Sequence, residues 1–248
     1  MNTAGSTNVI KQTLTIIAVL CLGSASTVLA QQNKDELKQR ILAQAQSVSP
    51  DDYAFTRTIR SEQTSGGNTE QHLNIEKFDP TKLTEARWTL VSVDGAPPST
   101  DALNTFRTDS AKRRVPGYAR LAVYFGTPAT ASTDSRGRTV FHFTALPKDT
   151  VKVMDSDVSQ NATADATVSE ANGVPFVEQV RITLRPMRLK LLFKMERYES
   201  TSRYRMGPEG KPLPMEQTSD MFGSGLGKEG RGHSVVTYSD YRAVGNQR

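Results

Sequence analysis

The chain has 248 residues, of which 36% are hydrophobic and 23% charged, and it carries a formal net charge of +5 at pH 7. This composition excludes a disordered chain and a collagen, because apolar residues are frequent enough to build a core. The mean hydropathy of −0.48 excludes a multi-span membrane protein. A single cysteine excludes an intrachain disulfide, so a soluble globular protein of one or two domains remains.

Residues 1–30 are predicted to form a secretory signal peptide. Lys11 supplies a positive charge, an apolar run covers Leu14–Gly23, and Val28 and Ala30 fit the small-residue pattern before a cleavage site. The run is shorter than the about 20 residues that a membrane-spanning helix needs. We therefore expect export to the periplasm, with an uncleaved N-terminal anchor as the alternative.

Removal of this segment leaves residues 31–248, which we expect to form a single domain without cysteine. Cys21 lies in the signal and follows Leu20 rather than the small residue of a lipid-attachment site. The densest basic clusters, 112–114 and 181–188, lack the interleaved aromatic residues of a nucleic-acid platform. We expect no nucleic-acid partner, whereas peripheral contact with an anionic membrane surface stays open.

Sequence patterns predict helices at two places and strands elsewhere. The predicted elements are, in chain order, a helix from Asn33 to Pro50, strands over 53–60 and 73–77 around a Gly66-Gly67-Asn68 turn, a strand over 87–93, a helical insert over about 99–126, and strands over 139–146, 163–170, 176–184, 187–195, 213–222 and 234–244. Residues 127–138 and the glycine-rich 223–232 are predicted to be loops.

The order of these elements predicts a mainly β (α+β) fold. Strands follow one another in hairpin order, without the strand–helix–strand alternation of a doubly wound nucleotide-binding fold. We expect a curved antiparallel half-barrel sheet with an N-terminal helix, and with the helical insert as a lid.

Polar residues give no catalytic or metal-binding pattern. His72, His142 and His233 are far apart in the sequence, and no zinc-binding spacing occurs. Ser224 lacks the G-x-S-x-G context of a serine hydrolase, and the glycines of 223–232 lack the phosphate-loop spacing. We expect no metal, no cofactor and no enzymatic activity; only a polar cluster inside a pocket would favour an enzyme.

The most informative pattern is apolar. One face of a predicted strand is methionine-rich and alternates with charged residues, a pattern that predicts a sheet with one buried face. This face consists of Met187, Leu189, Leu191, Phe193 and Met195, with Met215 and Met221 in phase on the next predicted strand. Methionine suits a surface that accepts variable apolar shapes. The face is therefore either an ordinary core or the wall of a ligand cavity.

Two parts of the sequence resemble known exported proteins. Lys77–Pro80, with Arg87–Gly95 and Pro97-Pro98, resembles an uncharacterised group of exported bacterial proteins. Tyr238–Arg242 resembles the last strand of the periplasmic lipoprotein carriers LolA and LolB. That resemblance implies an incomplete antiparallel barrel around an apolar cavity that binds acyl chains without covalent chemistry. The chain departs from the carriers in its Arg87-Trp88 block and its longer insert.

Two functional hypotheses follow. The first is a monomeric, periplasmic, non-enzymatic carrier for an apolar ligand, such as a lipid or an acylated protein. Its cavity wall would contain Trp88, Leu90, Leu189, Leu191, Phe193, Met195, Met215 and Met221, and its lid Leu103, Phe106 and Tyr118. The second is an interaction or sensing module with a filled core that binds another envelope protein. The size of the interior space distinguishes them.

Overall fold

The computed structural model describes residues 32–110, 115–153, 156–189, 193–225 and 228–244. The chain divides into two compact units, Met1–Arg40 and Ile41–Arg248, and the following account concerns the second. The predicted signal peptide lies outside the described residues. A first helix covers residues 32–47, and its Ile41 and Ala45 are fully buried. Within the described ranges, no helix is long and apolar enough to cross a membrane.

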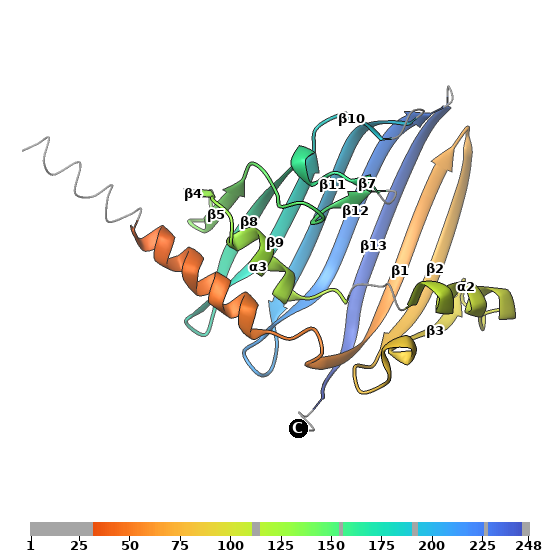
Figure 1. Cartoon of the computed structure of the whole chain (residues 1–248), viewed down its shortest axis with the longest axis horizontal. Coiled ribbons are helices and arrows are strands. Elements are labelled where there is room, and N and C mark those ends of the chain that lie inside the picture. Colours follow the sequence, from red (N-terminus) through yellow and green to blue (C-terminus); the bar gives the residue numbers. More distant parts are fainter. Residues whose placement is uncertain (1–31, 111–114, 154–155, 190–192, 226–227, 245–248) are drawn as a thin grey trace, which may run out of the picture. The chain divides into compact units, whose positions relative to one another are not determined.

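An antiparallel sheet of eleven strands dominates this unit, in the order β3-β2-β1-β13-β12-β11-β9-β8-β5-β4, with β10 paired to β11 (Figure 1). Its strands are β1 (Tyr53–Ser65), β2 (Asn68–Phe78), β3 (Trp88–Val93), β4 (Thr130–Thr133), β5 (Thr139–Phe143), β8 (Ala162–Ala171), β9 (Val174–Leu184), β10 (Met187–Leu189), β11 (Phe193–Met206), β12 (Pro212–Gly225) and β13 (Lys228–Ala243). A separate pair contains β6 (Lys152–Val153) and β7 (Ser156–Asp157). The sheet ends at β3 and β4 and is not closed, so the predicted mainly β fold with an open, curved antiparallel sheet is confirmed.

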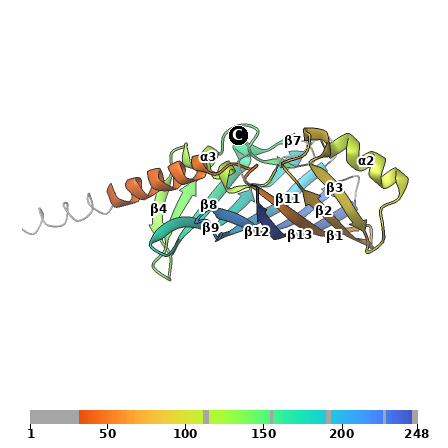
Figure 2. The same cartoon turned by 90° about the horizontal axis from the view of Figure 1, so that it is seen from below.

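Short helices cover one face of the sheet, which we call the inner face (Figure 2). They are η1 (Thr84–Ala86), α2 (Thr100–Ser110), η2 (Tyr118–Arg120), α3 (Leu121–Phe125) and η3 (Ser159–Asn161). The backbone N–H of Ala102 donates to Ser99 Oγ at 3.2 Å, so Ser99 caps the N-terminus of α2. In α3, the Phe125 ring lies 5.4 Å from Phe141 and 5.3 Å from Phe143.

Alternation along the strands explains why this face is covered. In β8, Ala162, Ala164, Ala166 and Val168 are buried, whereas the residues between them are partly exposed. Successive strand residues point to opposite faces, so one face of β8 is apolar and the other polar. Its small alanines leave space for the large rings of α3 and β5.

The predicted loop over 127–138 is wrong in part, because residues 130–133 form β4, an edge strand paired to β5. A tight turn joins the two strands. The Asp134 carboxylate accepts hydrogen bonds from the backbone N–H groups of Arg136 and Arg138, both at 2.9 Å, and Gly137 supplies a positive φ of 79°. The polar composition that suggested a loop is also what an exposed edge strand tolerates.

The predicted single strand over 187–195 is instead a hairpin. Met187 pairs with Met195, and Leu189 pairs with Phe193. Directly opposite residues of an antiparallel pair share a face, so the alternation that suggested one strand is preserved across two. Leu191, a predicted wall residue, lies outside the described residues.

The glycine-rich segment 223–232 is not a long loop either, since β12 runs to Gly225 and β13 begins at Lys228. A Cβ atom at Gly223 would lie 2.6 Å from the Lys194 carbonyl oxygen and 2.7 Å from Cζ of Phe193. Glycine at this position therefore permits close contact between β11 and β12 rather than chain flexibility.

Candidate functional site

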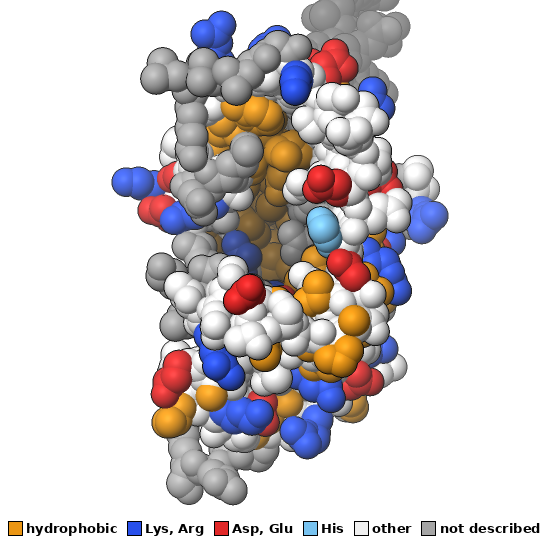
Figure 3. All heavy atoms as spheres, turned by 90° about the vertical axis from the view of Figure 1, so that its right-hand side faces the viewer, with side chains coloured by type: hydrophobic (Ala, Val, Ile, Leu, Met, Phe, Trp, Pro, Cys, Tyr) orange, Lys and Arg blue, Asp and Glu red, His pale blue; other side chains and the backbone are white. Residues whose placement is uncertain are grey.

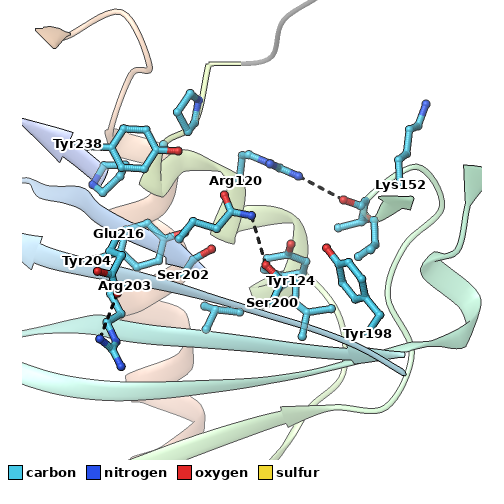
Figure 4. A pocket seen from close by; sticks show the side chains of 18 residues that line it. Arg120, Tyr124, Lys152, Tyr198, Ser200, Ser202, Arg203, Tyr204, Glu216 and Tyr238 are labelled. Atoms are coloured by element: carbon cyan, nitrogen blue, oxygen red, sulfur yellow. Dashed lines mark hydrogen bonds and ion pairs between the residues drawn. The ribbon is translucent and has the colours of Figure 1, made fainter. Parts of the chain in front are cut away.

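A hollow of about 170 Å³ lies between the segment 116–124 and the inner faces of β9, β11, β12 and β13 (Figure 4). An enclosed apolar space of about 150 Å³ is enough to hold a benzene ring. Its roof contains Pro116, Gly117, Arg120 and Tyr124; its floor and walls include Thr150, Val151, Lys152, Val180, Ile182, Tyr198, Ser200, Ser202, Tyr204, Pro214, Gln217 and Tyr238. Seen from the side of α2, β1 and β2, hydrophobic side chains line a deep hollow that charged groups border (Figure 3).

Tyr118 fixes the roof to the sheet. It is fully buried, its hydroxyl donates to Gln44 Oε1 at 2.8 Å, and it accepts from the Val177 backbone N–H at 2.8 Å. Its ring lies edge-on to Tyr204 with centroids 5.3 Å apart. The sequence placed Tyr118 in a lid, and the structure places it beside the hollow as an anchor for the segment that roofs it.

Arg120 is one of the cationic groups that line the hollow. Its side chain is exposed, and its Nη2 donates to the Thr150 carbonyl oxygen at 3.2 Å. Burial is the main cause that raises the pKa of Tyr124, Tyr204 and Tyr238, and the positive charge of Arg120 opposes that rise at all three. These phenols therefore lie within electrostatic reach of the guanidinium and remain protonated at neutral pH.

The floor is polar, and the hydroxyl at its centre, that of Ser200, has hydrogen-bond partners. Ser200 is 4% exposed, and its Oγ accepts hydrogen bonds from Gln217 Nε2 at 3.2 Å and from Ser219 Oγ at 3.1 Å. The residues lining the hollow include neither histidine, cysteine nor aspartate, and their one carboxylate, Glu216, is ion-paired with Arg203 at 3.2 Å. The polar groups of the described lining are therefore mainly hydroxyls, one amide and the cations Arg120, Lys152 and Arg203.

The two predicted wall residues at the β3 edge lie in a filled cluster. Trp88 and Leu90 are 5% and 8% exposed, and they pack with Phe106 of α2. Leu103, the other predicted lid residue of α2, packs against the same cluster. The cluster also contains Phe55, Phe78 and Tyr238.

The remaining predicted wall residues lie at different depths. Leu189 and Met195 are buried, at 3% and 1% exposed, while Phe193 is partly buried. Met221 is partly buried and pairs with Tyr198, which lines the hollow, so the two share the inner face. Met215 is 39% exposed at an irregularity of β12.

Sequence reasoning missed the floor of the hollow because it followed only apolar residues. Tyr198, Ser200, Ser202 and Tyr204 recur at every second position, with Glu199, Thr201 and Arg203 between them. This period-2 alternation of aromatic and small hydroxyl residues against mostly charged ones was the available signal.

The structure also brings together three polar residues of neighbouring strands on the outer face. Ser132 Oγ lies 2.7 Å from His142 Nε2, and His142 Nδ1 lies 2.7 Å from Asp165 Oδ1. The order of atoms resembles that of a hydrolase triad, and these contacts tie β4 to β5 and β8. The described residues contain no cluster of three or more potential metal ligands.

No protein-family model and no curated protein matches the chain. Among solved structures, it is similar to a LolA superfamily protein from Nitrosomonas europaea, with 16% sequence identity and a TM-score of 0.28. The match covers 83% of this chain and 93% of that chain.

We expect six of the seven tyrosines to ionise at unusually high pH. Burial raises the pKa of Tyr53 to about 12, and it also raises the pKa of Tyr118, Tyr124, Tyr204, Tyr238 and Tyr241. An unfolded chain releases these protons near pH ~10, so the folded state binds more protons above that pH. The stabilisation is complete below pH ~10 and declines as the pH rises toward the folded pKa values.

Ultraviolet absorbance of the phenolate measures this directly. The native protein should show little ionisation where the same protein in denaturant is half ionised. Seven tyrosines titrating together near pH ~10 in the folded state would contradict the burial of these phenols.

Proposed function

We propose that this protein is exported to the periplasm and acts as a non-enzymatic binding or carrier protein for an apolar ligand, such as a lipid or the acyl chain of an acylated protein. One observation carries the proposal: an unfilled hollow remains between the anchored roof and the inner face of an open sheet. Val180, Ile182 and aromatic rings supply its apolar surface. The proposal of binding rather than catalysis is supported by a described lining in which no histidine, cysteine or aspartate is present.

The size of the hollow limits what it holds. At about 170 Å³ it accepts a short section of an acyl chain or a ring, not a whole lipid. Each buried methylene contributes about 0.8 kcal/mol before the cost of ordering the ligand. We propose that a longer chain continues along the inner face from Tyr198 past Met221 toward Met195 and Leu189.

A second candidate function is an envelope interaction or sensing module. The filled cluster beneath α2, where Trp88 and Phe106 pack together, favours it. Native mass spectrometry of protein purified from its own periplasm distinguishes the two functions. A bound mass in the lipid range supports the carrier, and a bound second protein with no lipid supports the interaction module.

Ser202 and Thr201 provide a matched test of the hollow. Ser202 lines it, whereas Thr201, the next residue of β11, points to the opposite face. The substitution Ser202→Trp should fill the hollow and weaken binding of a fluorescent fatty acid by at least about tenfold, because the loss of two buried methylenes alone costs about 1.6 kcal/mol. Thr201→Trp should bind like the unmodified protein.

Organic extracts of the same preparations should contain lipid for the unmodified protein and for Thr201→Trp, and much less for Ser202→Trp. Circular dichroism and the urea midpoint verify that each variant is folded. Equal binding by the two tryptophan variants, or no lipid and no fatty-acid binding by the unmodified protein, would reject the proposal.

A further inference from the structure

Arg120 differs from the arginines that are paired on the sheet. Arg57, Arg87, Arg138, Arg181 and Arg203 each form an ion pair with a carboxylate. Within the described ranges Arg120 has no such partner, and its one hydrogen bond goes to the Thr150 carbonyl oxygen. A guanidinium has five N–H donors, so most of those of Arg120 remain available at the mouth of the hollow.

Phenol hydroxyls surround the same space. Tyr124, Tyr198 and Tyr204 line the hollow, and no described protein group forms a hydrogen bond with their hydroxyls. In Figure 4, Tyr124 lies below Arg120, Tyr198 lies to its right, and Tyr204 lies farther to the left beside Glu216. Burial raises the pKa of Tyr124 and Tyr204, so both stay protonated and able to donate.

The carboxylates nearest to this group are already ion-paired with other arginines. Glu216 occupies the strand position next to Gln217 and pairs with Arg203. Glu216 is the one carboxylate among the described lining residues, and the Arg203 guanidinium at 3.2 Å already balances its charge. Lys152 adds a second cation at the mouth, although it also contacts Asp149 at 3.1 Å. An uncompensated guanidinium with several hydroxyl donors is the chemistry that recognises an anion.

We infer that the ligand of the hollow is an anionic amphiphile, whose carboxylate or phosphate head group pairs with Arg120 and accepts hydrogen bonds from the phenols of Tyr124, Tyr198 and Tyr204. This inference rests on the proposed function and specifies its ligand class. The apolar part of the ligand then lies over Val180 and Ile182, and the head group stays at the mouth beside the exposed guanidinium.

The test compares dodecanoate with dodecanol, which share a chain and differ in head-group charge. The unmodified protein should bind dodecanoate at least about tenfold more tightly, because hydrogen bonds to charged groups are worth roughly this much. Arg120→Gln should remove that preference and leave dodecanol binding unchanged. Tyr204→Phe keeps the ring and should weaken only dodecanoate binding.

Arg60→Gln is the matched control, since Arg60 is exposed and lies on the outer face of β1. It removes the same charge and should change neither affinity. Equal affinities for both ligands, or an equal loss of both in Arg120→Gln, would overturn the head-group inference and leave the proposed function intact. Failure of both ligands to bind the unmodified protein would overturn the proposed function itself. Binding of inorganic phosphate without dodecanoate would identify a free-anion site and also overturn the inference.

Discussion

Replacement of Trp88 by alanine is expected to lower the free energy of unfolding by about 3–5 kcal/mol. The indole is 5% exposed, and its ring centroid lies 5.0 Å from Phe78 and 5.8 Å from Phe55. Arg57 Cζ lies 4.1 Å from the same ring in a cation–π contact. The substitution removes these contacts and leaves a cavity that the surrounding rings of two strands and α2 cannot fill completely.

Urea unfolding measures the change, and Val91→Ala is its control. Val91 lies on the same strand, β3, and is 40% exposed, so its truncation should change the free energy of unfolding by about 0.5 kcal/mol or less. A loss below about 1 kcal/mol for Trp88→Ala would contradict the packed cluster. Fatty-acid binding by the folded Trp88→Ala variant shows whether Trp88 also contacts the ligand. If binding is lost, Trp88 belongs to the ligand wall as the sequence suggested.

Local signals in the sequence predicted much of the fold. The hairpin of β1 and β2, the strand at β3 and the helix α2 of the predicted insert all depend on turn glycines, capping residues or periodicity within a few residues. Such signals are sufficient because they act over one turn or one strand pair. The mainly antiparallel class followed from the order of these elements.

The hollow was not predictable in the same way, because it is formed by segments far apart in the sequence. Its roof includes Arg120 of η2, and its floor includes Ser202 of β11. The hydrogen bonds of Tyr118 to Gln44 and to Val177 bring these segments together. The residue pattern around Tyr118 does not indicate that it anchors the roof. The pattern around Trp88 does not indicate that it lies outside the lining of the hollow. A prediction based on hydrophobicity alone therefore assigned residues of the filled cluster and of the inner face to one ligand wall.

A comparable loss of stability is expected from breaking the buried ion pair between Arg57 and Glu76. Glu76 is 1% exposed on the inner face, and Arg57 Nε donates to its Oε2 at 2.9 Å. Arg57→Met leaves the buried carboxylate without its guanidinium and removes the cation–π contact with Trp88. Loss of one partner of a buried pair costs about 3–5 kcal/mol.

The double variant Arg57→Met/Glu76→Leu separates the contribution of the ion pair from the cost of a buried carboxylate that has lost Arg57. Because both charges are then absent and the side chains remain apolar, most of the lost stability should return. Arg203→Met, in the exposed pair with Glu216, is the control and should cost about 1 kcal/mol or less. Urea midpoints of the four proteins in the cycle give the coupling energy. A double variant as unstable as the sum of its single variants would show that the two side chains act independently. If the double variant regains most of the lost free energy of unfolding, the charge pair is tolerated rather than required for folding. Its place beside Trp88 then has a reason other than stability.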